Sequence, residues 1–330
     1  MMTSPPPKVR LATLPTPLER LDRLSAAWGG PAIWVKRDDL TGFGLSGNKV
    51  RKLEYHLAAA QAAGADTLIT TGAAQSNHCR ATALAAARVG FRTLLVLRTP
   101  DGRAPARLEG NHLLDRLAGA EVRFVTPEEY AARDQALAAI ADELTADGRT
   151  PWVIPEGASD ALGMWGFVAA MSELHAQVDE IGPISAVWHA ASSGGTTAGL
   201  GWAADRLELD IPVTGSSIGD SVPDLRRRIE RIWAEAVVTY GGSWPVPHME
   251  LIDYHVGRGY GLTTEEELEI QAEATQLTGL IFDPTYTGKA IVGLRREIGA
   301  GRYGRDDTVV FWHSGGGFAV FSHDFGTVLD

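Results

Sequence analysis

Short apolar runs alternate with longer Ala- and Leu-rich segments along the chain, and this alternation predicts its secondary structure. Seven short runs are expected to form strands: Ala32–Val35, Thr67–Thr70, Thr93–Leu97, Trp152–Ile154, Ala186–His189, Val213–Ser216 and Thr308–Trp312. Eight longer segments are expected to form helices: Lys49–Ala63, Arg80–Val89, Pro105–Leu117, Glu128–Ala146, Leu162–Val178, Val222–Ala236, Glu265–Leu277 and Gly288–Ile298. Continuous apolar strands between helices are typical of mostly parallel sheets that helices cover on both faces. The pattern therefore predicts an α/β fold.

Local signals mark the ends of some of these helices. Thr264 and Glu267 have the spacing of a capping box, in which each side chain binds the other's backbone N–H. Gly64 and Gly279 lie where a helix commonly ends in a left-handed residue.

Composition and charge exclude several functional classes. The 330 residues are 45% hydrophobic and 22% charged, which is ordinary for a globular protein of about two domains. The net charge of −11 disfavours partners such as nucleic acid or an anionic membrane, which bind basic surfaces. No apolar run is long enough to span a membrane, and the first ten residues do not resemble a signal peptide. The single cysteine, Cys79, leaves no internal disulfide, so we expect a cytoplasmic protein.

A glycine pattern at residues 42–47 resembles a dinucleotide-binding loop but lies in the wrong place. The segment fits G-x-G-x-x-G and precedes an expected helix. A dinucleotide-binding fold needs the first glycine at the end of the strand. Here residues 36–41 separate the strand from Gly42, so an oxidoreductase that uses this loop is the least favoured alternative.

Lys49 follows the turn Gly47–Asn48 and begins an expected helix. The positive end of a helix disfavours the charged form of an amine, and a lowered pKa is what a lysine needs to attack an aldehyde. A solvated lysine in the first helical turn is the simpler interpretation of this fragment alone.

Residues 70–78 run from a strand through a turn of small residues into a helix. The free N–H groups at that helix start, with the side chains of Ser76 and Asn77, are suited to a carboxylate. Ordinary helix capping by either side chain is the alternative. His78 and Cys79 are adjacent on the helix and point in different directions, so we expect no metal site there.

Residues 191–199 carry several hydroxyls and glycines directly after an apolar strand and before a helix. Glycines let the backbone approach an anion, and hydroxyls donate hydrogen bonds to it. No lysine follows as in nucleoside triphosphate loops, so the loop fits a single phosphate group.

Two later loops and the last apolar strand add further polar groups. Tyr260 lies between two glycines, and Tyr286 lies in the segment 283–289. Such tyrosines can act as acids or hold a substrate, although many are packing residues. Ser314 and three glycines follow the strand that ends at Trp312, and ligands of open α/β sheets bind at such strand ends. One ligand, pyridoxal phosphate, would unite these pieces. It needs an amine for its aldehyde, a loop for one phosphate, a hydroxyl for its ring nitrogen and a carboxylate site for its substrate.

Four stretches carry a resemblance to a known family: Trp34–Asp39, Gly47–Glu54, Gln75–His78 and Tyr286–Lys289. With these motifs, the chain from Leu14 to Phe321 resembles the D-cysteine desulfhydrase and 1-aminocyclopropane-1-carboxylate deaminase family. That family belongs to the tryptophan-synthase-β type, or fold type II, of pyridoxal-phosphate enzymes. The resemblance implies two open, twisted, mostly parallel sheets, with the cofactor between a large domain (1–50 plus 166–330) and a small domain (51–165). It also implies a homodimer.

The resemblance implies a role for each matching residue. Lys49 would bind the cofactor aldehyde and then take the Cα proton, while Ser76 would contact the substrate carboxylate or help with protons. Asn77 would donate to the phenolic oxygen of the cofactor. The catalytic residues are then expected to be Lys49, Ser76, Tyr260 and Tyr286. The expected cofactor contacts are Lys49, Asn77, Ser193, Gly194, Gly195, Thr196, Thr197, Thr287 and Ser314. The expected substrate contacts are Ser76, Asn77, His78 and Arg258.

The late motifs bear on the reaction. The deaminases have Tyr-Glu-Gly-Lys where this chain has Thr287 in place of Glu, and the His-Thr-Gly-Gly of the desulfhydrases is similar to residues 313–316. Ser314 is therefore the expected partner of the ring nitrogen. A neutral hydroxyl suits β-elimination, which favours conversion of D-cysteine to pyruvate, ammonia and hydrogen sulfide.

Three alternatives stay open. Arg258 stands where the family commonly has proline. A cation beside Tyr260 could bind a sulfonate group, and the first alternative is therefore an L-cysteate sulfo-lyase. A surface position is the other interpretation of Arg258. A 1-aminocyclopropane-1-carboxylate deaminase is the second alternative. The third is a non-catalytic protein that carries or senses pyridoxal phosphate.

Overall fold

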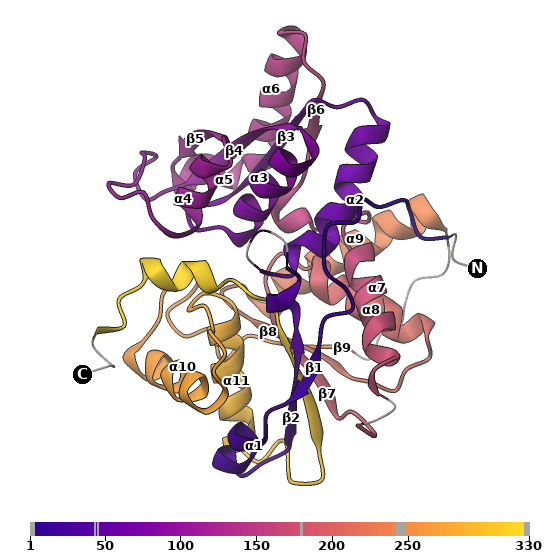
Figure 1. Ribbon diagram of the computed structural model, residues 1–330, viewed down its shortest axis with the longest axis vertical. Helices are drawn as coiled ribbons and strands as arrows, with labels where there is room; N and C mark the ends of the chain where they lie inside the picture. Colours follow the sequence, from indigo (N-terminus) through magenta and orange to yellow (C-terminus); the bar gives the residue numbers. More distant parts are fainter. Residues whose placement is uncertain (1–3, 43, 45, 179–180, 242–248, 327–330) are drawn as a thin grey trace.

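Two mostly parallel sheets form the framework of the computed structural model, which describes residues 4–42, 44, 46–178, 181–241 and 249–326 (Figure 1). The six-stranded sheet has the order β1-β2-β10-β7-β8-β9. Its strands are β1 (Leu18–Arg20), β2 (Ala32–Arg37), β7 (Ala186–Ala191), β8 (Val213–Ser217), β9 (Met249–Ile252) and β10 (Thr308–His313). The four-stranded sheet has the order β5-β4-β3-β6. Its strands are β3 (Thr67–Ala73), β4 (Arg92–Arg98), β5 (Glu121–Val125) and β6 (Pro151–Val153).

Helices surround both sheets. They are α1 (Asp22–Trp28), α2 (Lys49–Ala62), α3 (Asn77–Val89), α4 (Gly110–Leu117), α5 (Pro127–Ala131), α6 (Arg133–Ala146), α7 (Trp165–His175), α8 (Gly195–Arg206), α9 (Val222–Tyr240), α10 (Glu265–Thr278) and α11 (Thr287–Gly299). Within the described part of the chain, no helix combines the length and apolarity needed to cross a membrane.

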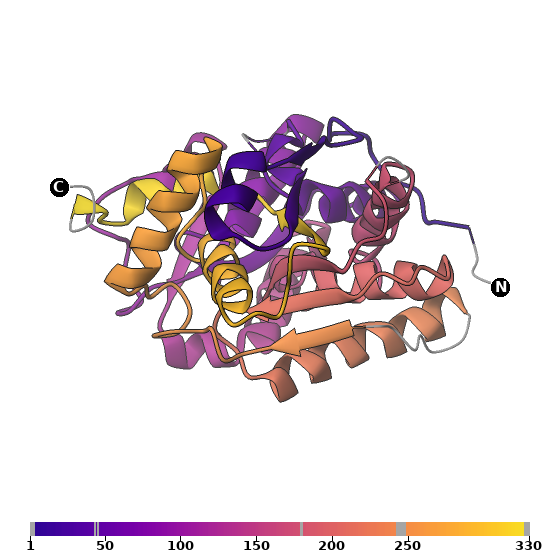
Figure 2. The ribbon, with the colours of Figure 1, turned by 90° about the horizontal axis from the view of Figure 1, so that it is seen from below.

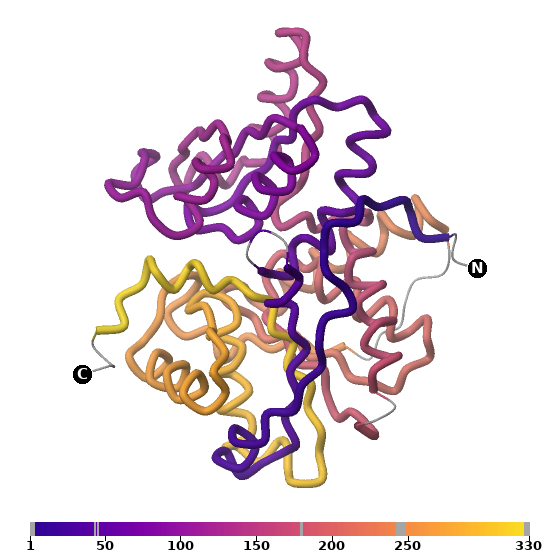
Figure 3. Tube along the Cα trace, in the orientation of Figure 1, coloured from indigo at the N-terminus to yellow at the C-terminus, as the bar shows by residue number. Residues whose placement is uncertain are grey.

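Strands from distant parts of the sequence pair in the larger sheet. β10 pairs with β2 in parallel, with Thr308 opposite Ala32, and the two run side by side in Figure 3. β10 also pairs in parallel with β7, and only β1 of the described strands runs antiparallel to its neighbour. The α/β class predicted from the sequence, with mostly parallel sheets flanked by helices, is confirmed.

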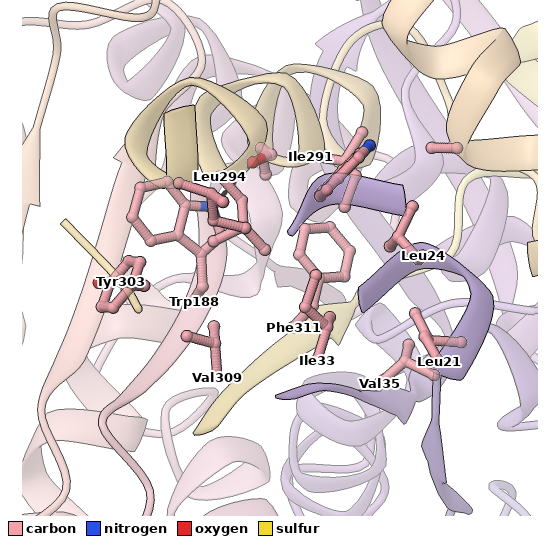
Figure 4. Packing of buried hydrophobic residues seen from close by; sticks show 14 of the residues in the cluster. Leu21, Leu24, Ile33, Val35, Trp188, Ile291, Leu294, Tyr303, Val309 and Phe311 are labelled. Carbon is pink, nitrogen blue, oxygen red and sulfur yellow. Dashed lines mark hydrogen bonds between the residues drawn. The ribbon is translucent and has the colours of Figure 1, made fainter. Parts of the chain in front are cut away.

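Alternate residues of the central strands face opposite layers of helices. On β10, Val309 and Phe311 pack with α1, α10 and α11, as Figure 4 shows for part of this core. Val310 and Trp312 point the other way and pack with α7 and α8. The strand is apolar on both faces for this reason, and Figure 2 shows helices packed around the sheet.

The structure corrects several predicted boundaries. Three edge or short strands (β1, β5 and β9) and helix α1 were not predicted from the sequence, and α8 was expected only as a helix of unstated length after the 191–199 segment. The helix expected at Pro105–Leu117 begins at Gly110, and the helix expected at Glu128–Ala146 is broken at Ala132. Half-buried β5 and the glycine-containing α8 lack the strong apolar patterns on which the prediction depended.

The predicted helix ends are confirmed more closely. Thr264 and Glu267 form the reciprocal capping box of α10, and Gly279 is its left-handed C-cap. Gly64 is one residue beyond the C-cap of α2 and is also left-handed, with φ of 68°.

The two sheets come from different stretches of the chain. All four strands of the smaller sheet lie between residues 67 and 153, within the segment expected to form the small domain. The larger sheet takes its strands from both sides of that segment. Helix α2 packs against α3 of the smaller unit and against α7 of the larger unit. The start of α2 is therefore fixed relative to both.

A buried network of charges holds α2 on the larger sheet. Asp38, directly after β2, accepts two hydrogen bonds from the guanidinium of Arg51 on α2, at 2.8 and 2.9 Å. Arg51 also donates two hydrogen bonds of 3.0 Å to Glu173 on α7. Lys36 on β2 donates to the same Glu173, and Trp312 on β10 donates to Asp38 at 2.9 Å. Two strands and two helices thus meet at one buried ionic cluster.

Asp38→Asn tests this cluster. The amide presents a donor to Arg51 and removes the charge that compensates it, so we expect the free energy of unfolding to fall by about 3 kcal/mol. Urea-induced unfolding of the holoprotein, followed by tryptophan fluorescence, measures the change. Glu143→Gln is the matched control, since Glu143 pairs with Arg123 on the surface and its loss should leave the unfolding midpoint unchanged. Equal losses in the two variants would contradict the proposed importance of the buried cluster.

Candidate active site

A small cavity lies where strands of the larger sheet end and three helices begin. It is bordered by the residues that follow β7 and β10 and by the first residues of α2 and α3, with the start of α8 on the same side. Ligands of open α/β sheets bind at such carboxyl ends of strands. The sequence-predicted residues that line it are Lys49, Asn77, Ser193, Gly194, Thr196, Thr197, Tyr286 and Ser314.

Lys49 is the first residue of α2, and its half-buried side chain faces the cavity. Gly47 precedes it with φ of 115°, a conformation that favours glycine and turns the chain into the helix. Burial lowers the pKa of Lys49 to about 8, although the charge of Glu156 acts in the opposite direction. The amine is therefore far more often neutral near neutral pH than that of an ordinary lysine, as nucleophilic attack on an aldehyde requires.

The start of α8 forms an anion-binding cradle. Gly194 is its N-cap in a left-handed conformation and supplies no side-chain cap to the first-turn N–H groups. The side chains of Ser193, Thr196 and Thr197 border the same space. A Cβ at Gly195 would lie 2.7 Å from both Lys52 Nζ and Ser159 Oγ, so only glycine fits there. Free N–H groups, hydroxyls and the positive end of a helix suit a phosphate.

Lys52 places a buried amine beside this cradle and was not predicted from the sequence. Its Nζ is buried and donates to Ser159 Oγ at 3.0 Å and to the Gly157 carbonyl at 3.3 Å. Burial and the nearby charge of Lys49 lower the pKa of Lys52 well below its usual value. A bound phosphate would restore its charged form. The signal available in the sequence was the spacing, because Lys52 lies one turn after Lys49 on the same helix face.

Asn77 and Ser314 present free polar groups to the cavity. Asn77 Oδ1 accepts a hydrogen bond of 2.9 Å from Asn111, and its Nδ2 has no acceptor among the described residues. A Cβ at Gly316 would lie 2.7 Å from Asn77 Nδ2, so glycine keeps this amide accessible. The Ser314 carbonyl accepts from Asn48 N–H at 3.0 Å, while its hydroxyl has no partner in the described part of the chain.

Tyr260 and Tyr286 meet at their hydroxyls, with an O–O distance of 2.8 Å. Burial raises the pKa of Tyr260 to about 12 and that of Tyr286 well above its usual value. Both hydroxyls therefore stay protonated at neutral pH and can donate hydrogen bonds or a proton. Asp283, which the sequence analysis did not single out, accepts the Tyr286 backbone N–H at 2.9 Å and fixes this loop.

Six expected site residues are not in the cavity lining: Ser76, His78, Gly195, Arg258, Tyr260 and Thr287. Ser76 caps α3, with its Oγ accepting the Cys79 N–H at 3.2 Å, which is the capping role that the sequence also allowed. His78 is buried, with its Nε2 2.7 Å from Thr70 Oγ1. Thr287 is fully buried and donates to Asp283 at 2.8 Å.

Arg258 is exposed and lies outside the cavity lining, so the structure gives it the surface position that the sequence left as an alternative. The cation beside the Tyr260 ring is Arg98, whose guanidinium carbon lies 5.7 Å from the ring centre. Arg98 is the last residue of β4. A charged residue at the carboxyl end of an apolar strand was the signal that could have identified it.

Arg80 is a further cavity residue that sequence analysis did not identify. One of its guanidinium nitrogens donates to the Ser46 carbonyl at 2.9 Å and another to Asn111 at 3.1 Å. Burial lowers its pKa to about 10. Arg80 thereby links the turn before Lys49 to the side chain that orients Asn77.

Comparisons with known proteins agree with this geometry. The family model described as "Pyridoxal-phosphate dependent enzyme" matches residues 9–315, and the chain belongs to this family. The chain is 36% identical over 319 residues to the D-cysteine desulfhydrases of Salmonella paratyphi A and Salmonella newport, covering 96% of each chain. Among solved structures, it resembles an "ACC deaminase homologue" with a TM-score of 0.90 and 36% identity, over 98% of this chain and 97% of the other. An O-ureido-L-serine synthase, 17% identical with a TM-score of 0.66, shares the fold.

The cavity residues fit pyridoxal phosphate. Lys49 would supply the amine for its aldehyde, and the α8 cradle with Lys52 would hold its phosphate. Asn77 Nδ2 and the Ser314 hydroxyl would be the free groups for its phenolic oxygen and ring nitrogen. Because residue 195 is glycine, the space beside Lys52 and Ser159 stays open. A side chain at this position would collide with both residues.

The lowered pKa of Lys49 predicts how the apoprotein takes up the cofactor. The neutral amine reacts with an aldehyde, so the uptake rate should rise up to about pH 8 and then level off. Visible absorption after addition of pyridoxal phosphate measures the rate. Lys49→Arg should abolish the absorption, whereas Lys8→Arg, at a partly exposed ion pair with Glu54, should leave it unchanged. A wild-type rate that keeps rising well beyond pH 9 would contradict the assignment.

Proposed function

We propose that the protein catalyses β-elimination from D-cysteine to pyruvate, ammonia and hydrogen sulfide. The observation that carries this proposal is one cavity lined by a lysine amine of lowered pKa and by the protonated Tyr286, whose hydroxyl contacts that of Tyr260. The 36% identity to D-cysteine desulfhydrases over nearly the whole chain supports the substrate. Bound pyridoxal phosphate would supply the electron withdrawal that makes the Cα–H bond of an amino acid acidic.

The side chains of the cavity provide the remaining steps. Lys49 would take the Cα proton, for which its neutral form is required. Tyr286, in contact with Tyr260, would donate a proton to the departing sulfur. The free N–H groups at the start of α3 would hold the substrate carboxylate. Loss of the Cα proton and of the Cβ–S bond leaves an unsaturated amine, which water converts to pyruvate and ammonia.

The lining of the cavity favours β-elimination over opening of a cyclopropane ring. Ring opening requires strong electron withdrawal, which a carboxylate at the ring nitrogen would support by keeping it protonated. Among the described residues that line the cavity there is no Asp or Glu, and Ser314 offers a neutral hydroxyl at the end of β10. This composition supports the desulfhydrase over the deaminase alternative.

The expected homodimer and the cytoplasmic location belong to the same proposal. The homodimer rests on the resemblance to the family. The cytoplasmic location rests on the single buried cysteine, which needs no oxidising compartment. Light scattering of the purified protein measures the oligomeric state.

Pyruvate release tests the reaction. We expect the holoenzyme to release pyruvate and sulfide in equal amounts from D-cysteine, and to release no keto acid from 1-aminocyclopropane-1-carboxylate. Lys49→Ala should abolish the release, because the base for the Cα proton is lost. A loaded wild-type enzyme that releases no keto acid from any amino acid would instead favour a non-catalytic carrier or sensor of the cofactor.

Tyr286→Phe tests the proton donor. Removing a general acid should lower kcat by about 100-fold while KM changes little, because the hydroxyl acts on the departing sulfur. Tyr254→Phe is the control, since Tyr254 is exposed and its hydroxyl contacts Glu297 outside the cavity. If both variants retain full kcat, the role assigned to Tyr286 is wrong.

A further inference from the structure

Asn111 connects Asn77 to Arg80, two residues that line the cofactor cavity. It is the second residue of α4, its side chain is fully buried, and the sequence analysis did not single it out. Its side-chain amide contacts three groups: the Arg80 guanidinium, the Gln75 backbone carbonyl and the Asn77 side chain. Polar groups of α3, of α4 and of the loop before α3 therefore meet at one buried amide.

The partners of Asn111 leave its amide only one orientation. A guanidinium can only donate hydrogen bonds, so the amide atom 3.1 Å from Arg80 Nη1 must be the oxygen. A backbone carbonyl can only accept, so the amide atom 2.8 Å from the Gln75 carbonyl must be the nitrogen. The two requirements agree, and turning the amide over would place donor against donor and acceptor against acceptor.

The orientation of Asn111 in turn selects that of Asn77. One hydrogen of Asn111 Nδ2 is donated to the Gln75 carbonyl, and the other is donated to Asn77 Oδ1 at 2.9 Å. The oxygen of Asn77 is therefore the atom that faces α4, and its Nδ2 is the atom that remains for the cavity. Arg80 and Gln75 thus determine, through two amides in series, which end of Asn77 a ligand meets.

The backbone around Asn111 is fixed closely enough to keep this geometry. The Asn111 N–H donates to Gln75 Oε1 at 2.9 Å, and Gln75 Nε2 donates to the Glu109 carbonyl at 3.2 Å. Gly110 lies between these two contacts with φ of 55°, and a Cβ there would lie 2.4 Å from Gln75 Oε1. The Gln75 side chain therefore holds the start of α4 against the loop before α3.

We infer that Asn111 is a positioning residue that makes Asn77 a hydrogen-bond donor toward the phenolic oxygen of pyridoxal phosphate. This inference rests on the cofactor contact expected of Asn77, and it is independent of the reaction that the enzyme catalyses. An ionised phenolic oxygen accepts a strong hydrogen bond from an N–H group, whereas the oxygen end of an amide repels it. The fixed polarity from Arg80 through Asn111 to Asn77 sets the favourable orientation before the cofactor binds.

Asn111→Asp tests the inference, because a carboxylate has the shape of the amide but only accepts hydrogen bonds. The Asn77 amide would then turn its nitrogen to Asp and its oxygen to the cofactor. Tryptophan fluorescence measures the Kd of the dialysed protein for pyridoxal phosphate and for 3-deoxypyridoxal phosphate, which lacks the phenolic oxygen. We expect the preference for pyridoxal phosphate, the ratio of the two Kd values, to fall by about 10-fold. Gln61→Glu, which makes the same change of charge at an exposed position of α2, should leave the ratio unchanged.

A double-mutant cycle separates an effect through Asn77 from a general effect of the new charge. In an Asn77→Ala background, Asn111→Asp should leave the preference nearly unchanged, because the amide through which it acts is gone. The visible absorption of the holoprotein is a second readout, and Asn111→Asp should shift its maximum in the same direction as Asn77→Ala. A loss of preference that persists in full in the Asn77→Ala background would overturn the inference.

Asn111→Leu covers the case in which the carboxylate prevents folding. Leucine is similar in size and has no polar atom, so the Asn77 amide is free to turn and the preference should fall by about 3-fold. Retained binding of the deoxy analogue shows that each variant is folded. A folded Asn111→Asp or Asn111→Leu protein with the wild-type preference would contradict the role of Asn111.

The same measurements also test the contact on which the inference rests. If Asn77→Ala alone leaves the preference unchanged, Asn77 does not contact the phenolic oxygen and the inference is wrong. None of these outcomes depends on turnover, so a failure of the proposed elimination is recognised separately, by the absence of pyruvate release.

Discussion

The buried pairing of Asp38 with Arg51 is the constraint on which the position of the site depends. A buried charge is tolerated only when it is compensated, so Asp38 must stay within hydrogen-bonding distance of Arg51 and of the Trp312 indole. Arg51 is two residues after Lys49 on the same helix, and Trp312 is two residues before Ser314 on the chain. One ionic cluster thus fixes Lys49 and Ser314 relative to each other.

The site has basic side chains in and around its cavity and no described carboxylate in the cavity lining. Lys52 lies beside the start of α8, and Arg98 packs against Tyr260. Burial lowers the pKa of the lysines and raises that of the tyrosines, so each group is shifted toward the protonation state that the proposed elimination uses. The same burial therefore acts in opposite directions on the proposed base and the proposed acid.

The sequence predicted what depends on local pattern and missed what depends on pairing in space. The apolar runs gave the central strands, and the glycine- and hydroxyl-rich segments gave Lys49, Asn77, Ser193 and Ser314 at the cavity. Edge strand β5 was missed and the bounds of helix α8 were not predicted, because their patterns are weak, and Ser76 turned out to satisfy a helix N-terminus. The cation beside Tyr260 was sought next to it in the sequence, at Arg258, whereas β4 supplies it as Arg98. The local sequence does not show which strand end lies opposite a given loop.

The parallel pairing of β10 with β2 has a consequence for synthesis of the chain. The smaller sheet uses strands between residues 67 and 153 and has all its partners once that segment has emerged. The larger sheet stays open between β2 and β7 until Thr308–His313 is made, because β10 fills the place between them. Domains generally fold as units during synthesis, and unpaired strand edges are prone to aggregate. The strand between β2 and β7 is thus the last strand of the sheet to be synthesised, and the edges of β2 and β7 that face it stay unpaired until then.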